Sequence, residues 1–103
     1  MSKVEERLQA LGFALPQPPR PAAAYVPAVR TGSLVFVSGQ GPVRDGQAVY
    51  TGKVGAEQTE EEGYKAAQIA ILNALAVLKA EIGNLDKVTR IVKLVGWVNS
   101  APG

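Results

Sequence analysis

The chain has 103 residues, 47% of them apolar and 19% charged, so its length allows one small domain with a modest core. The net charge of +2 comes from 11 basic and 9 acidic residues that are scattered along the chain. This weak excess argues against nucleic acid as a partner. Neither cysteine nor histidine is present, which excludes disulfides, thiolate metal sites, cysteine nucleophiles and Ser-His-Asp triads. We therefore expect no metal ion and no cofactor.

The first segment has the pattern of a short amphipathic helix. Val4, Leu8 and Leu11 lie at helical spacing with charged residues between them, which predicts a helix from about Val4 to Leu11, ended by Gly12. No apolar stretch is long enough for a signal peptide or a membrane span. We therefore expect a soluble cytoplasmic protein with no membrane partner.

A proline-rich segment, PQPPRPAAA, occupies residues 16–24. Prolines fix φ and remove backbone donors, so this stretch is expected to be extended. An arm laid over the domain surface is favoured over a flexible linker. The predicted organisation is an N-terminal helix and proline-rich arm over residues 1–24, followed by a domain over residues 25–103.

Two runs rich in β-forming residues come next. Tyr25 to Val29 and Leu34 to Val37 are separated by Arg30-Thr31-Gly32-Ser33, a pattern typical of a β-hairpin. Asp45-Gly46 predicts a second tight turn. A short strand is expected after it, from Ala48 to Tyr50.

The clearest helix start in the chain is Thr59, with Glu62 three residues later. This is the capping-box pattern. Gly83 is a C-terminal stop signal, so the sequence predicts a helix from Thr59 to Ile82. Residues at steps of three and four define one apolar face of this helix; they are Tyr64, Ala67, Ile71, Leu75, Leu78 and Ile82.

A second stripe on this helix consists of small residues, namely Gly63, Ala67, Ala70 and Ala74. Small residues allow a helix to approach a sheet closely, which is the favoured interpretation. A groove for a ligand is the alternative.

The last predicted element is a strand over Asp86 to Val98, in which apolar residues fall on both sides. Such a strand needs a helix on one face and a further cover on the other. We therefore expect that the chain is not a stable monomer, because equal subunits around a symmetry axis would supply that cover. The order helix, hairpin, long helix, strand predicts an α+β sheet with helices packed on one face.

Ser38-Gly39-Gln40 follows the apolar strand directly. Gly39 would let a ligand or another backbone approach closely, while Ser38 and the main-chain N–H groups offer hydrogen-bond donors. A bulge or turn at the strand end explains the same residues equally well.

The region around this segment resembles the N-terminal signature of the RidA/YjgF family, also named the reactive-intermediate deaminase or endoribonuclease L-PSP family. The resemblance covers about residues 22–98. The helix at Val4 to Leu11 lies outside it and indicates a divergent subgroup. The matching residues are Tyr25, Arg30-Thr31-Gly32, Leu34 to Val37, Ser38-Gly39-Gln40 and Pro42.

The resemblance implies a chorismate-mutase-like α+β fold and a homotrimer with ligand clefts between subunits. It also implies hydrolysis of 2-enamine and 2-imine intermediates to 2-oxo acids and ammonia. Tyr25, Ser38, Gly39 and Trp97 would then contact a small carboxylic acid, with Tyr25 and Ser38 in one inter-subunit cleft and Trp97 as a packing or cleft-wall residue. No catalytic residue is identified. The alternative is a non-enzymatic protein that binds 2-oxo acids on the same trimeric scaffold.

One departure from the family concerns its carboxylate-binding arginine and its water-positioning glutamate. Both lie in a C-terminal stretch that follows the region matched here, so we expect the fold to be incomplete. The chain is a fragment, or a second chain supplies the rest, or the deaminase site is lost. We also expect the 103 residues alone not to hydrolyse 2-imino acids. RNA cleavage is disfavoured by the absence of histidine and of a basic patch.

Overall fold

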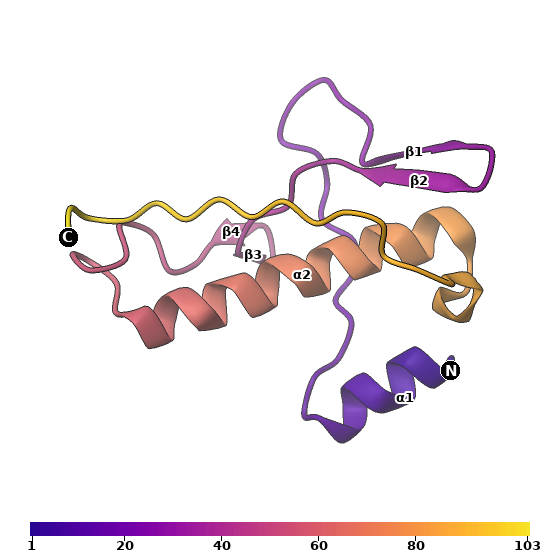
Figure 1. Cartoon of the computed structure of the whole chain (residues 1–103), viewed down its shortest axis with the longest axis horizontal. Helices are drawn as coiled ribbons and strands as arrows, with labels where there is room; N and C mark the ends of the chain where they lie inside the picture. The colour runs from indigo at the N-terminus through magenta and orange to yellow at the C-terminus, as the bar shows by residue number, and fades with distance from the viewer.

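The structure is a computed structural model that describes residues 1–103, and it confirms the α+β fold (Figure 1). A long central helix, α2, carries a β-hairpin and a smaller hairpin on one side, and the short helix α1 packs near its C-terminal end. The elements are α1 (Lys3–Ala10), β1 (Ala28–Thr31), β2 (Leu34–Val37), β3 (Val43–Arg44), β4 (Gln47–Ala48), α2 (Glu60–Ile82) and the 3-10 helix η1 (Leu85–Lys87).

The predicted first hairpin is confirmed, with antiparallel pairing from Ala28 opposite Val37 to Thr31 opposite Leu34. Its first strand begins later than predicted, because Pro27 has no N–H to donate to a ladder. Arg30 and Thr31, which were assigned to the turn, belong to β1 instead. The turn therefore consists of Gly32 and Ser33 only. Gly32 has a positive φ of 56° and Ser33 does not, which is the pattern of a type II′ turn.

The second hairpin pairs β3 with β4 around Asp45-Gly46. Both turn residues have positive φ, 53° and 78°, as a type I′ turn requires. The predicted strand from Ala48 to Tyr50 is wrong in its bounds, since β4 is Gln47–Ala48. Tyr50 has a φ of 55°, a left-handed conformation that interrupts an extended strand.

The capping box at the start of α2 is confirmed. The Thr59 hydroxyl accepts a hydrogen bond from the Glu62 N–H at 3.1 Å, and the Glu62 carboxylate accepts one from the Thr59 N–H at 2.8 Å. These backbone and side-chain bonds to Thr59 lower the pKa of Glu62. At the other end, Gly83 has a φ of 86°, where a side chain would be strained.

Thr59→Ala is expected to lower the free energy of unfolding by about 1 kcal/mol, because the first turn of α2 loses its cap. Urea unfolding followed by circular dichroism measures this loss. Thr51→Ala is the matched control, since the Thr51 side chain is exposed and makes no hydrogen bond. An equal loss in both variants would contradict the role of the cap.

The apolar face predicted for α2 is not its buried face. The buried residues are Asn73, Ala76 and Val77, whereas Tyr64 is 68% exposed and Ile71 is 39% exposed. The helix is apolar around most of its circumference, so periodicity alone could not decide which side would be covered. The hairpins pack against one side of α2, and Tyr64 and Ile71 remain exposed.

The small-residue stripe of α2 gives close packing at one position. A side chain at Gly63 would lie 2.8 Å from Val54, so the loop that carries Val54 approaches the helix closely there. Ala67, in the middle of the stripe, is exposed. The close approach is therefore made by a loop, not by the predicted strands.

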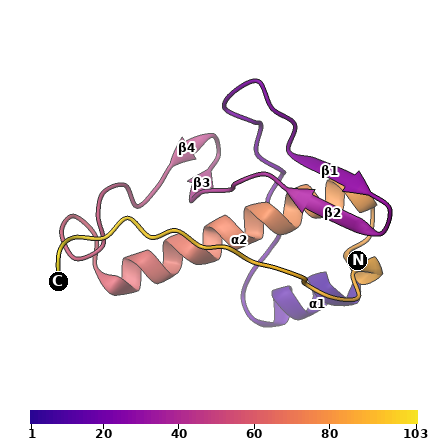
Figure 2. The same ribbon diagram turned by 45° about the horizontal axis from the view of Figure 1, so that its top comes forward.

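The strand predicted over Asp86 to Val98 does not form. Leu85–Lys87 is a 3-10 helix, and segment 88–98 runs beside α2 without joining a β-ladder (Figure 2). Its backbone is tied only at its two ends, where Val88 donates to the Leu85 carbonyl and Val54 donates to the Asn99 carbonyl. A β-strand requires a neighbour at hydrogen-bonding distance, and no strand of this structure reaches segment 88–98.

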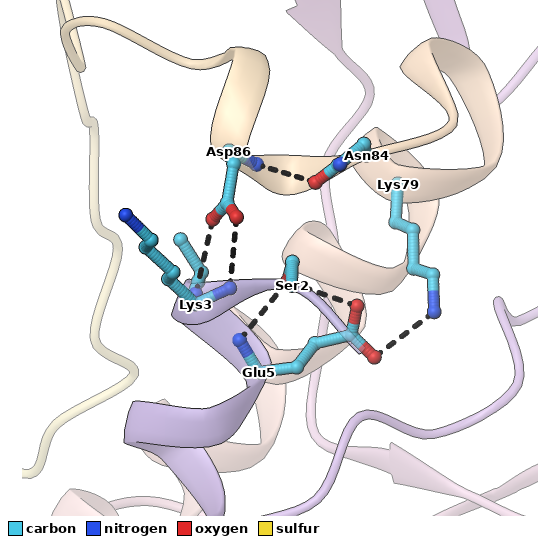
Figure 3. Close-up of polar contacts among 7 residues, drawn as sticks. Ser2, Lys3, Glu5, Lys79, Asn84 and Asp86 are labelled. Carbon is cyan, nitrogen blue, oxygen red and sulfur yellow. Dashed lines mark hydrogen bonds and ion pairs between the residues drawn. The ribbon is translucent and has the colours of Figure 1, made fainter.

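Helix α1 forms as predicted, and five hydrogen bonds shape its start (Figure 3). The Ser2 hydroxyl accepts from the Glu5 N–H at 3.1 Å and so caps the helix. The Asp86 carboxylate accepts from the N–H groups of Lys3 and Val4 at 2.8 and 3.1 Å. The Glu5 carboxylate accepts from Lys79 Nζ and from the Ser2 hydroxyl, both at 3.0 Å. A carboxylate at a helix N-terminus also suits the helix dipole, so Asp86 both caps α1 and holds it against η1.

The docking of α1 is expected to weaken in acid. The hydrogen bond from Lys79, assisted by the one from Ser2, lowers the pKa of Glu5 below its ordinary value. The contribution of the ionised Glu5 carboxylate to the docking of α1 is therefore complete above the ordinary glutamate pKa of about 4.3. This contribution is lost as the pH falls through the lowered pKa. Hydrogen exchange of the α1 amides between pH 7 and pH 3 measures this. Glu5→Gln should flatten part of the pH profile, whereas Glu6→Gln, on the exposed side of α1, should leave it unchanged.

Little of the chain is fully buried. The buried residues number five of 103, and the apolar ones among them are Ala76, Val77 and Leu85. The proline-rich arm contains no helix or strand and lines, with α1 and α2, a cavity of about 530 Å³. No helix has the length and apolar content that crossing a membrane requires. Much of the apolar surface of this fold is thus open to solvent.

Candidate functional site

The candidate site lies where β2 ends and the chain approaches the start of β1. Ser38 donates its N–H to the Pro27 carbonyl at 2.9 Å and its hydroxyl to the Val26 carbonyl at 2.6 Å. These bonds continue the hairpin past its last ladder pair and bring Ser38 beside the residues that follow Tyr25. Tyr25 itself is exposed. The structure therefore places Tyr25, Ser38 and Gly39 at the same end of the hairpin.

The loop after Ser38 is held through its carbonyl groups. Gln40 Nε2 donates to the Ser38 carbonyl at 3.2 Å. Asn73, in the middle of α2, donates from Nδ2 to the carbonyls of Gly41 and Val43 at 3.0 and 2.8 Å. Asn73 is 2% exposed, so this contact fastens the loop to the core. Sequence reasoning missed Asn73, although it is the one polar residue in the run AILNALAVL.

The N–H groups of the same loop remain free. The backbone amides of Gly39, Gln40 and Gly41 donate to no acceptor in the structure. A Cβ atom at Gly39 would meet nothing within 4 Å, so the space beside this α-carbon is open. A backbone N–H group without an acceptor can donate to an anion such as a carboxylate.

No cationic side chain is bound next to these donors. Arg30 Nη2 donates to the Glu81 carbonyl at 3.3 Å, which holds this arginine near the C-terminal end of α2. Lys79 pairs with Glu5 at the α1 contact. No three His, Cys, Asp or Glu side chains gather where they could hold a metal ion. Residues 38–41 themselves carry no charged side chain.

Trp97 lies apart from this arrangement. It belongs to segment 88–98 and is 92% exposed. No hydrogen bond joins segment 88–98 to β2 or to the Ser38 loop. Its place in a ligand site, like the roles of Tyr25, Ser38 and Gly39, stays a prediction.

Two solved structures resemble this chain closely. A "putative endoribonuclease" from Shewanella oneidensis MR-1 has a TM-score of 0.80 and 40% identity, over 84% of this chain and 58% of that protein. A protein of unknown function from Agrobacterium tumefaciens has a TM-score of 0.76 and 39% identity, over 85% of this chain and 54% of that protein.

One curated protein is also similar to this chain in sequence. Protein TCP17 of Trypanosoma cruzi is 42% identical over 100 residues, which are 97% of this chain and 62% of that protein. The chain thus spans less than two thirds of each of these relatives.

Residues 5–102 match the family described as "YjgF/chorismate_mutase-like, putative endoribonuclease". This match takes in the N-terminal helix as well as the hairpin and α2, and is thus wider than the resemblance read from residues 22–98. Together with the structural relatives it confirms the chorismate-mutase-like fold. On this evidence, the chain is a member of the YjgF family.

Proposed function

We propose that this chain forms one wall of a site for small 2-imino or 2-oxo carboxylic acids, and that the complete site hydrolyses 2-enamine and 2-imine intermediates. The observation that carries the proposal is the run of free N–H groups at Gly39, Gln40 and Gly41, at the same end of the hairpin as Tyr25. Membership of the YjgF family supports the same substrate class.

In the proposed reaction the enamine first becomes the imine, and water then adds to its C=N carbon. The resulting carbinolamine loses ammonia as the C–N bond breaks, which leaves the 2-oxo acid. The backbone donors of the Ser38 loop hold the substrate carboxylate and so fix the position of the adjacent reacting carbon. The Ser38 hydroxyl donates a hydrogen bond to the Val26 carbonyl, so its role in the proposal is to shape the loop and not to act as a nucleophile.

The proposed site needs a partner surface. Hydrogen bonds from a guanidinium to a carboxylate are stronger than those from neutral donors, and the one arginine whose side chain makes a hydrogen bond, Arg30, is held at the C-terminal end of α2. We propose that a neighbouring subunit, or further polypeptide of the family domain, supplies the cation and the group that positions water. A homotrimer with clefts between subunits would provide such a surface.

A non-enzymatic binding protein for 2-oxo acids is the second candidate. One observation favours it: the hydrogen bonds around Ser38 and Gln40 leave no free general base in the loop, and the chain has no histidine or cysteine. Such a protein would use the same N–H groups without turnover.

A coupled assay separates these candidates. A dehydratase generates the 2-imino acid, and release of the 2-oxo acid is followed with and without added protein. The 103-residue chain alone is expected to give no acceleration. A chimera, in which the part of the Shewanella oneidensis protein that this chain does not match follows Gly103, is expected to accelerate release. Binding without acceleration by the chimera would favour the non-enzymatic protein, and acceleration by the chain alone would contradict the need for a partner surface.

A further inference from the structure

A cavity of about 530 Å³ lies between α1, residues 13–18 and the last part of α2. In both views of the fold α1 lies on the other side of α2 from the four strands (Figures 1 and 2). None of residues 38–41 lines the cavity. Its volume falls in the range of sites that bind small molecules, so it is a candidate ligand site separate from the Ser38 loop.

The lining of this cavity carries one positive and one negative side chain. Lys79 Nζ lies 3.0 Å from Glu5 Oε2, and both residues line the cavity. The Glu5 carboxylate accepts one further side-chain bond, from the Ser2 hydroxyl, whereas Lys79 makes no other (Figure 3). An ammonium has three donors and a carboxylate about four acceptor positions. Both groups can therefore bind a ligand without giving up the bond between them.

The C-terminal end of α2 adds an uncharged acceptor. Three of the last four carbonyl groups of this helix accept a hydrogen bond. The fourth, that of Ala80, accepts none, and Ala80 is among the residues that line the cavity. The last carbonyls of a helix carry partial negative charge. This end of the cavity thus offers a cation two acceptors, the Glu5 carboxylate and a helix carbonyl.

Much of the remaining lining is apolar. It includes Phe13, Leu15 and Pro16, together with Ala76 of α2, and no side chain other than Glu5 and Lys79 is charged. Phe13 and Leu15 are only partly exposed. An apolar group of a ligand would lose contact with water here, which favours binding, and an aromatic ring would also find an aromatic partner in Phe13.

We infer that this cavity binds an α-amino acid with a large apolar side chain, such as phenylalanine, whose ammonium contacts Glu5, whose carboxylate contacts Lys79 and whose side chain packs on Phe13. A single carbon separates the two charged groups of an α-amino acid, which suits two protein charges 3.0 Å apart. A carboxylic acid without an ammonium would bring a negative charge beside Glu5, and an amine without a carboxylate a positive charge beside Lys79. The zwitterion pairs both protein charges at once.

Titration of the 15N-labelled chain with L-phenylalanine, followed by NMR, tests this site. Saturable shifts are expected at the amides of Glu5, Gln9, Phe13 and residues 79–83, and none at residues 39–41. Two analogues each lack one charge: 3-phenylpropionate has no ammonium and phenethylamine has no carboxylate. Both are expected to bind at least about tenfold more weakly than phenylalanine, since each loses a hydrogen bond between charged groups.

Lys79→Gln separates contact with the ligand from the docking of α1. The preference for phenylalanine over phenethylamine is expected to disappear in this variant, because the carboxylate loses its charged partner. The preference over 3-phenylpropionate should persist, because Glu5 still binds the ammonium. If Lys79 only held α1 in place, the variant would weaken all three compounds alike.

Two alanines of α2 provide matched variants that keep the Glu5–Lys79 pair. Ala80 and Ala67 are both exposed, and only Ala80 lines the cavity. Ala80→Phe is expected to abolish binding of phenylalanine by filling the cavity, and Ala67→Phe to preserve it. Absence of shifts around the cavity, equal affinity for the three compounds, a uniform loss in Lys79→Gln, or equal effects of the two phenylalanine variants would each overturn the inference.

Discussion

Asn73→Ala is expected to lower the free energy of unfolding by about 2–4 kcal/mol, because the two carbonyls that Asn73 now satisfies lose their donor and a buried side chain is removed. Both hydrogen bonds run from one buried amide to the loop, at 3.0 and 2.8 Å to the Gly41 and Val43 carbonyls. The loop that presents the free N–H groups would therefore be released along with the loss of stability. Urea unfolding measures the first effect, and hydrogen exchange of residues 39–43 measures the second.

Gln68→Ala is the control for Asn73→Ala, because Gln68 is a partly exposed polar residue of the same helix whose side chain makes no hydrogen bond. It should change stability by less than about 0.5 kcal/mol. If Asn73→Ala destabilised the protein without loosening residues 39–43, Asn73 would be a core residue and not the anchor of the loop.

Gly39→Val is expected to lower kcat/KM of the chimera about 10–100-fold while leaving stability nearly unchanged. The first effect follows because a side chain in front of the free N–H groups blocks the approach of the carboxylate, and each lost hydrogen bond to a charged group costs about 1.5–3 kcal/mol. The second follows because a side chain at Gly39 meets no atom within 4 Å and the backbone there is not left-handed. The coupled assay and urea unfolding of the isolated chain measure the two effects.

Ser33→Ala provides the comparison for Gly39→Val, since Ser33 is an exposed turn residue at the opposite end of the same hairpin. The chimera with Ser33→Ala should have the same kcat/KM as the unsubstituted chimera. Full activity of Gly39→Val would mean that the substrate does not approach the backbone at this position, and the proposed site would be wrong.

The sequence correctly predicted the features that depend only on residues close together in the chain. The capping box at Thr59, the stop at Gly83 and the turn at Asp45-Gly46 each depend on residues within a few positions of one another, and all three are confirmed. The strand predicted over Asp86 to Val98 does not form, because a strand depends on a distant neighbour that its own alternation cannot reveal. The prediction of the buried face of α2 was wrong for a related reason, because the helix is apolar on two sides and the sequence does not show which side is covered.

In the candidate site, too, the sequence indicated the residues with a local signature and missed the residue whose contacts are distant. The signature SGQG, with Tyr25 before it, pointed to the hairpin end, and the structure bonds Ser38 there to Val26 and Pro27, the residues that follow Tyr25. Asn73 was missed because its bonds to Gly41 and Val43 span about 30 residues of sequence. An isolated polar residue inside an apolar helical run was the available signal, since a buried amide requires hydrogen-bond partners.

The central claim is that the free N–H groups of Gly39, Gln40 and Gly41 bind a carboxylate. Titration of the 15N-labelled chain with 2-oxobutyrate, followed by NMR, tests it directly. Saturable shifts of these three amides are expected, with no comparable change at Gly46 in the β3–β4 turn and with loss of the shifts in Gly39→Val. Absence of shifts at residues 39–41, or equal shifts at Gly46, would contradict it.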